Sequence, residues 1–243
     1  MYLEKYNLKG RNAVVTGGGQ AIGLACVEAL AEAGAHVVIA DYNAQVAETG
    51  RDAMKAKGYA CDIAIVDVTD SKGVEALAEK LEKTGGTQIL VNNAGIARSE
   101  IPGENMEDER WLNVLDVNLN GTFWCCRSFG KRMLARKSGS IVNIGSMSGF
   151  IVNKPQEQSH YNASKAAVHH LTRFLAVHLT KERILCNAIA PGPFPTWMLS
   201  TGVGFGGKTE GVDWDAIGKR NPSGRVGTPE DIAGLAIFLS SRA

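Results

Sequence analysis

Short apolar runs alternate with helix-like segments along nearly the whole chain, and this alternation constrains the fold more than any other feature. Six runs rich in valine and isoleucine are predicted to be strands, at 12–16, 36–40, 61–66, 88–92, 140–144 and 184–189. Each run is short and largely apolar, which is typical of strands buried on both faces of a parallel sheet. The segments between them, near 21–33, 43–57, 70–83, 105–136 and 158–181, have helical periodicity. The pattern predicts an α/β fold with a doubly wound parallel sheet and helices on both faces.

No linker-like tract or internal repeat divides the chain, which favours one domain over residues 1–243, and the composition is that of a soluble globular protein. Lys and Arg total 26 against 25 Asp and Glu, a net charge of +1, which argues against a broad basic surface for nucleic acid or a polybasic membrane anchor. The N-terminus lacks an apolar signal core and no stretch reaches the roughly 18 apolar residues of a membrane span, so we expect a cytoplasmic protein. The five cysteines include no CxxC pair. We therefore expect buried reduced thiols and no metal site.

A glycine-rich turn follows the first predicted strand and opens the first predicted helix. It reads Thr16-Gly17-Gly18-Gly19-Gln20-Ala21-Ile22-Gly23, with alanine where a third glycine is expected. Glycines let the backbone approach a pyrophosphate, and a helix N-terminus supplies N–H donors for it. A plain tight turn is the alternative, but the position between strand and helix favours a dinucleotide site. Cofactor contacts are predicted at Gly17, Gly19, Gln20, Ala21, Ile22 and Gly23.

Asp41 ends the second predicted strand, 18 residues after Gly23. An acid at this distance accepts hydrogen bonds from the adenosine ribose hydroxyls and would repel a 2′-phosphate. Neither Gly18 nor Tyr42 offers a positive charge to such a phosphate, so NAD is predicted as the cofactor and NADP is disfavoured. Tyr42, Asp67 and Val68 are further predicted cofactor contacts, although a turn or helix-cap role is an alternative for Asp67.

Tyr161 and Lys165 lie four residues apart in a predicted helix, which places both on one helical face. A lysine ammonium near a phenol stabilises the phenolate, so Lys165 is expected to lower the pKa of Tyr161. Such a tyrosine can exchange a proton with an alcohol or a carbonyl oxygen. Taken alone, an ordinary surface pair is the alternative, so the interpretation depends on the rest of the chain.

Further motifs around this pair occur in a specific order. After the loop at 16–23 come Asp67, Asn92-Asn93-Ala94-Gly95, Asn118, Ser146, Tyr161 with Lys165, and Pro191-Gly192. In this order the chain resembles the short-chain dehydrogenase/reductase family over most of its length, and the family's loop tolerates alanine at position 21. The resemblance implies a Rossmann-type fold, an oxidoreductase that interconverts a secondary alcohol and a ketone, and a homo-oligomer, either a dimer or a tetramer.

The resemblance also implies roles for individual residues. Tyr161 is expected to be the general acid/base, Ser146 to hydrogen-bond the reacting oxygen, and Lys165 to bind the nicotinamide ribose. Asn118 is expected to hold a water that links Lys165 to solvent, although an ordinary helix residue is the alternative. Further cofactor contacts are implied at Asn93, Ala94, Gly95, Pro191, Gly192, Phe194 and Thr196. Asn92 belongs to the motif Asn92-Asn93-Ala94-Gly95. The alternative is that it simply ties neighbouring strands together.

The residues between Ser146 and Tyr161 resemble the polyol and ketose branch of the family, which includes galactitol, sorbitol and mannitol dehydrogenases. Substrate contacts are expected at Ser146, Ser148, Asn153, Gln156, Tyr161 and Trp197. A polyol, a sugar or a hydroxy acid is therefore the expected substrate. Two alternatives stay open: a 3-oxoacyl thioester reductase, and a dinucleotide-binding regulatory protein without turnover.

Residues 193–227, rich in proline and glycine, are expected to form a substrate loop or lid. His169 and His170 follow Lys165 on the same predicted helix, and we expect them to pack against neighbours or a partner subunit. A last helix is predicted at 228–241, with Thr228 as its N-cap. The family usually continues into one more strand, which is expected to be absent from this chain.

Overall fold

Six parallel strands form one sheet in the order β3-β2-β1-β4-β5-β6. The structure, a computed structural model, describes residues 1–97, 101–152, 157–195 and 213–243. The strands are β1 (Asn12–Thr16), β2 (His36–Asp41), β3 (Cys61–Ile65), β4 (Ile89–Asn92), β5 (Gly139–Ile144) and β6 (Ile184–Ile189). The predicted doubly wound α/β fold is confirmed, and each predicted strand agrees with the structure to within one residue at either end.

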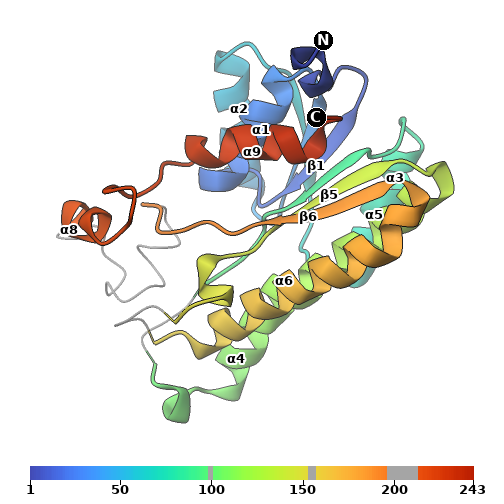
Figure 1. Cartoon of the computed structure of the whole chain (residues 1–243). Coiled ribbons are helices and arrows are strands. Elements are labelled where there is room, and N and C mark those ends of the chain that lie inside the picture. The colour runs from blue at the N-terminus through green and yellow to red at the C-terminus, as the bar shows by residue number, and fades with distance from the viewer. Residues whose placement is uncertain (98–100, 153–156, 196–212) are drawn as a thin grey trace.

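Helices cover both faces of the sheet (Figure 1). On one face lie α1 (Ala21–Glu32), α2 (Ala44–Ala56) and α9 (Glu230–Ser240), and on the other lie α3 (Ser71–Glu82), α5 (Thr122–Arg136) and α6 (Ser159–Leu179). Alternate residues of each strand enter different cores. Val15 and Ile39 pack beneath α1 and α2, whereas Val14 and Val38 pack in the core of α3 and α5. Burial on both faces explains why the strand sequences are apolar throughout rather than alternating.

Short helical segments complete the described chain. They are η1 (Leu3–Tyr6), η2 (Gly103–Asn105), α4 (Asp108–Leu115), η3 (Asp116–Gly121), η4 (Met147–Gly149), η5 (Thr180–Glu182) and α8 (Trp214–Lys219). The continuous helix predicted over 105–136 is interrupted, because α4 and α5 are joined by η3, which is a π-helix. A π-helical turn accommodates an additional residue and often occurs at functional sites. Here it contains Asn118.

The carboxyl ends of all six strands lie at one edge of the sheet. Thr16, Asp41, Asn92 and Ile144 end four of them. The chain winds outward from β1 to β3 on one side and then from β4 to β6 on the other, so the winding direction changes between β1 and β4. Open α/β sheets bind ligands in the crevice outside the carboxyl ends at such a point.

All five cysteines are free thiols. Four of them are buried, and Cys61 is partly exposed. Burial raises the pKa of Cys26, Cys125 and Cys186 to about 12, so these groups stay protonated thiols at neutral pH. Within the described ranges, no three His, Cys, Asp or Glu side chains are grouped to hold a metal ion. In the same part of the chain, no helix is long and apolar enough to cross a membrane.

Ala21 begins α1 with a φ of +49°, in the left-handed region that disfavours residues with a side chain. The cost for an L-residue is about 1–2 kcal/mol, and glycine avoids most of it. We predict that Ala21→Gly raises the free energy of unfolding by about 0.5–1 kcal/mol, because relief of strain exceeds the entropy that glycine adds to the unfolded chain. Urea denaturation measures the difference.

Ala25→Gly is the matched control for this variant, since Ala25 lies within α1 and is absent from the residues with positive φ. Ordinary helical alanine is more favourable than glycine by about 1 kcal/mol, so this control should lose stability. Equal losses in the two variants would show that the backbone at Ala21 is not strained.

Candidate active site

The loop between β1 and α1 presents backbone N–H groups at the carboxyl edge of the sheet. Among the described residues no side chain caps α1, and its first turn holds no acidic residue. These N–H groups and the positive end of the helix dipole therefore suit an anion. A Cβ on Gly23 would overlap the carbonyl oxygen of Gly17, so glycine is required for α1 to pack on the loop. The loop fits the pyrophosphate of a dinucleotide.

Asp41 lies beside this loop at the end of β2 and is 6% exposed. Its Oδ1 accepts a hydrogen bond from the Asn43 N–H at 3.1 Å, and its Oδ2 accepts one from the Gly19 N–H at 3.4 Å. Tyr42 is 72% exposed. The carboxylate is thus fixed at the predicted ribose position, and the two residues that follow it carry no positive charge.

Asp67 and Val68 follow β3 and have different surroundings. Asp67 is exposed, and its Oδ1 accepts hydrogen bonds from the N–H and hydroxyl of Thr69 at 2.9 and 2.8 Å. Bonds of this kind stabilise a turn, which is the alternative role considered for Asp67. Val68 is buried and contacts the π-helix, since a Cβ on Gly121 would lie 2.7 Å from Val68 Cγ2. Contact of either residue with the cofactor stays a prediction.

Two adjacent asparagines connect three strand ends. Asn93 Nδ2 donates to the carbonyl oxygens of Thr16 and Gly17 at 3.1 and 2.9 Å, which ties the end of β4 to the glycine-rich loop. Asn92 Nδ2 donates to Asn143 Oδ1 on β5 at 2.9 Å. Asn92 therefore ties neighbouring strands, which is one of the two roles expected for it. Asn93 and the adjacent Ala94 lie at the sheet edge near the loop.

Tyr161, Ser146 and Lys165 come together beside the end of β5. The Ser146 side chain lies close enough to the Tyr161 phenol to lower its pKa. Lys165 Nζ donates to the Ile144 carbonyl oxygen at 2.8 Å and lies 5.7 Å from the centroid of the Tyr161 ring. The first turns of α6 thus place a phenol and an ammonium next to a serine hydroxyl that comes from another element.

Asn118 completes the group from the π-helix and is fully buried. Its Oδ1 accepts from the Ile96 N–H at 2.8 Å, and its Nδ2 donates to the Ile96 carbonyl oxygen and to Ser164 Oγ at 2.9 and 3.0 Å. A Cβ on Gly95 would lie 3.2 Å from Asn118 Oδ1 and 3.4 Å from Lys165 Nζ. The structure therefore brings all four residues of the expected tetrad, and Gly95, into one site; their catalytic roles stay predictions.

Burial sets the acid-base character of the site. Burial raises the pKa of Tyr161, and the neighbouring Ser146 side chain opposes this rise. Burial also lowers the pKa of Lys165 to about 8. The expected lowering of the Tyr161 pKa by Lys165 is therefore wrong for this structure, because the ammonium is hydrogen-bonded to a carbonyl oxygen and desolvation dominates at the phenol.

The turn after β6 packs against the Ser146 segment. The Met147 N–H donates to the Pro191 carbonyl oxygen at 3.0 Å. Gly192 is the next residue along the chain and lies beside this contact. Phe194 is buried in the core beneath α1 and α9, so only its backbone is available for the predicted cofactor contact. Residues 196–212 of the predicted lid at 193–227 lie outside the described residues, as do four predicted contacts. These contacts are Asn153, Gln156, Thr196 and Trp197.

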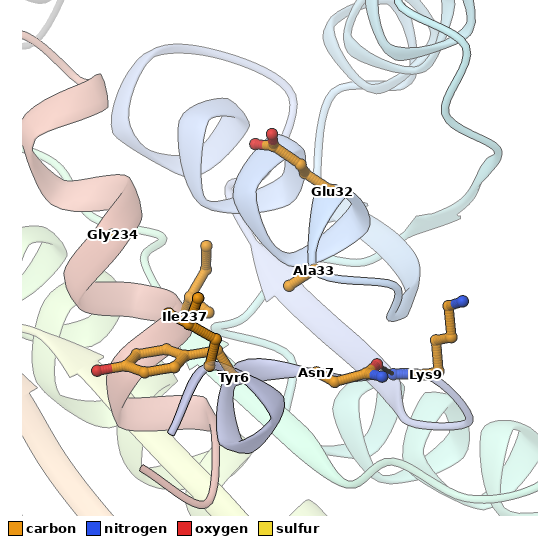
Figure 2. Close-up of a pocket in the computed structure, with 8 residues that line it drawn as sticks. Tyr6, Asn7, Lys9, Glu32, Ala33, Gly234 and Ile237 are labelled. Carbon is orange, nitrogen blue, oxygen red and sulfur yellow. Dashed lines mark hydrogen bonds between the residues drawn. The ribbon is translucent and has the colours of Figure 1, made fainter. Parts of the chain in front are cut away.

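The hollow in Figure 2 lies apart from this site. It is lined by Leu3, Tyr6, Asn7, Lys9, Glu32, Ala33, Gly234 and Ile237. Ala33 follows the last turn of α1 and Lys9 precedes β1, so the hollow lies at the amino end of the sheet. None of the predicted site residues lines it, and we do not assign the reaction to it.

Two residues of the site were not predicted to have a role there. Ser164 Oγ accepts from Asn118 and donates to the Tyr161 carbonyl oxygen at 2.8 Å, and His169 contacts the main chain of Ser146. The spacing of Tyr161, Lys165 and His169, four residues each, was a usable signal for a shared helical face. Which residues pack against that face of α6 depends on the tertiary structure, and spacing alone does not reveal it.

Comparisons with known proteins assign the chain to a family. A family model described as enoyl-(acyl carrier protein) reductase matches residues 17–243. A galactitol 2-dehydrogenase from Rhizobium johnstonii is 48% identical over 244 residues, covering 100% of this chain and 92% of that protein. The chain belongs to the short-chain dehydrogenase/reductase family.

Solved structures agree with this assignment. A short-chain type dehydrogenase/reductase from Mycobacterium marinum has a TM-score of 0.91 and 32% identity, covering 100% of this chain and 92% of that one. A gluconate 5-dehydrogenase from Burkholderia cenocepacia J2315, in complex with NADP and tartrate, has a TM-score of 0.88 and 35% identity, with the same two coverages. The predicted class is confirmed: this dehydrogenase is an oxidoreductase acting on CH–OH groups with a nicotinamide dinucleotide.

The buried ammonium of Lys165 makes the stability of the dehydrogenase depend on pH. Its pKa is lowered from 10.5 to about 8 on folding, so between these values the unfolded chain binds more protons than the folded one. The free energy of unfolding should therefore rise with pH over this window, by up to about 3 kcal/mol from this group. We predict that Lys165→Met is more stable than the wild type at pH 7 and that its advantage shrinks toward pH 10.5.

Urea denaturation of both proteins at several pH values measures this difference, and other titrating groups cancel in the comparison. Lys72→Met, at an exposed position of α3, is the matched control and should show a difference that is constant with pH. A constant difference for Lys165→Met as well would mean that the ammonium is not desolvated in the folded state.

Proposed function

We propose that the chain is an NAD-dependent dehydrogenase that interconverts a secondary alcohol of a polyol and the corresponding ketose. The grouping of the Ser146 hydroxyl, the Tyr161 phenol and the Lys165 ammonium at the carboxyl edge, beside Gly95, carries the proposal. The likeness to a galactitol 2-dehydrogenase supports the substrate class, because that relative matches this chain over its whole length.

In the direction of oxidation, Tyr161 takes the proton of the substrate hydroxyl, and in reduction it returns a proton to the carbonyl oxygen. Ser146 donates a hydrogen bond to the same oxygen, which stabilises the negative charge that develops there. Lys165 binds ribose hydroxyls of the cofactor, while Asn118 holds the segment after β4 against α6 through Ile96 and Ser164. A nicotinamide dinucleotide held by the glycine-rich loop, Asp41 and Lys165 would supply the acceptor for the hydride of the carbinol carbon.

We also propose that copies of the chain associate into a homo-oligomer. Exposed apolar side chains on α4 and α6 support this, namely Leu112, Phe174 and Val177. Phe174 and Val177 lie three residues apart on α6 and so are neighbours on its surface, and exposed apolar patches often mark an interface with another protein. Ser148, which is buried beside Ser146, is a proposed contact to substrate hydroxyls within each copy.

The proposal is tested by following absorbance at 340 nm with galactitol, sorbitol, mannitol, gluconate and a 3-oxoacyl thioester, each with NAD(H) and NADP(H). We expect turnover with polyols and NAD. Tyr161→Phe should reduce kcat by about 10²–10⁴-fold, because the proton acceptor is lost, while the Kd for NADH stays within about twofold. Thioester reduction alone would support the reductase alternative, and NADH binding without any turnover would support a regulatory protein.

Asp41 tests the cofactor preference separately. We predict that Asp41→Ala raises the KM for NAD by about tenfold or more, since two ribose hydroxyls lose a charged acceptor, and leaves kcat nearly unchanged. Asp41→Asn removes the charge but keeps one acceptor oxygen, so the KM for NADP should fall as repulsion of the 2′-phosphate disappears. Asp52→Ala, on the exposed side of α2, is the control for loss of a negative charge. An unchanged ratio of NAD to NADP efficiency would remove Asp41 from cofactor selection.

A further inference from the structure

His169 reaches the catalytic segment from the third turn of α6. It lies four residues after Lys165 and eight after Tyr161, on the same side of the helix. Its ring is 5% exposed, and Nε2 lies 2.9 Å from the Ser146 carbonyl oxygen and 3.3 Å from the Ser146 nitrogen. One nitrogen therefore faces both polar groups of the Ser146 main chain.

The chain around Ser146 is shaped to hold this ring. A Cβ on Gly145 would overlap His169 Cε1, and one on Gly149 would lie 2.6 Å from His169 Cδ2. Phe150 stacks on the imidazole with ring centroids 4.2 Å apart and planes inclined by 28°. The segment thus wraps around the ring, and the absence of side chains at both glycines creates the space.

The main chain on either side of Ser146 is held by different partners. The Gly145 N–H donates to the Ile189 carbonyl oxygen at 2.7 Å, and the Met147 N–H donates to the Pro191 carbonyl oxygen at 3.0 Å. Ser146 itself faces His169 from α6. The contact at 2.9 Å is the shorter one and suits an Nε2–H that donates to the Ser146 carbonyl oxygen.

We propose that His169 is a positioning residue that fixes the main chain of Ser146 and so aims its hydroxyl at Tyr161 and the reacting oxygen. This role rests on the proposed function of Ser146. The Ser146 hydroxyl also accepts a hydrogen bond from the Ser148 N–H at 3.1 Å, so its direction depends on the local turn. A rotation of the Ser146 peptide would move the hydroxyl away from the phenol, although both side chains would still be present.

His169→Phe keeps an aromatic ring against Phe150 but removes the hydrogen bond. We expect kcat with the best polyol to fall by about 10–100-fold, the loss typical of a misplaced reacting group, while the Kd for NADH stays within about twofold. His169→Gln can place its own Nε2–H near the position of the imidazole Nε2–H, so it should restore kcat to within about threefold. His169→Asn is too short for this and should behave like His169→Phe. Thermal unfolding of each variant verifies that it is folded.

A double-mutant cycle with Ser146→Ala separates positioning from a general structural role. If His169 acts through the Ser146 hydroxyl, His169→Phe should cause no further loss of kcat in the Ser146→Ala background. A structural defect would lower kcat by the same factor in both backgrounds. His170→Gln, at the adjacent exposed position, is the matched control and should leave kcat unchanged.

Failure of this inference and failure of the proposed function give different results. No turnover of any polyol by the wild type would refute the function, whereas wild-type turnover with full activity of His169→Phe would refute only the role of His169. A crystal structure of His169→Phe gives a readout without activity: the Ser146 hydroxyl should be displaced from the Tyr161 hydroxyl. An unmoved serine, or equal losses in both backgrounds of the cycle, would overturn the inference.

Discussion

The hydrogen bond from the buried Lys165 ammonium to the Ile144 carbonyl oxygen is the contact on which the site depends. It joins α6 to the carboxyl end of β5 at the point where the strand stops and the Ser146 turn begins. A buried ammonium is costly unless it is hydrogen-bonded, so this contact fixes how α6 lies on the sheet. Tyr161 and His169 flank Lys165 on the same helix, and their positions relative to Ser146 follow from it.

Amide side chains perform a related task at the other strand ends. Asn93 ties β4 to the glycine-rich loop, Asn92 ties β4 to β5, and Asn143 Nδ2 donates to Thr172 Oγ1 on α6 at 2.9 Å. Asn118 links the chain after β4 to α6 through Ser164. An amide suits these places because it donates and accepts at once, so one buried side chain can satisfy groups from two elements. The edge of the sheet is therefore held rigid by polar contacts around the site.

The sequence was informative where local rules decide the structure. Apolar runs predicted the six strands, and the spacing of Tyr161 and Lys165 predicted a shared helical face, because both follow from backbone periodicity. The π-helix at Asn118, the positive φ of Ala21 and the contact of His169 with Ser146 were not predicted. Each depends on what packs against the segment, such as Val68 against Gly121, and one strand or helix in isolation contains no signal for it. The pKa of Tyr161 was misjudged for the same reason, since spacing from Lys165 does not reveal how deeply the phenol is buried.

Asp41 illustrates how one side chain can organise a binding site before a ligand arrives. Its two oxygens accept N–H groups from the glycine-rich loop and from the start of α2, where Asn43 in turn caps the helix by accepting from the Val46 N–H at 3.2 Å. The carboxylate therefore holds together the two elements that would contact a pyrophosphate and an adenosine ribose. A carboxylate has about four lone-pair sites, so these two bonds leave capacity for ribose hydroxyls. The proposed selection against a 2′-phosphate would therefore depend on the same negative charge that holds the loop.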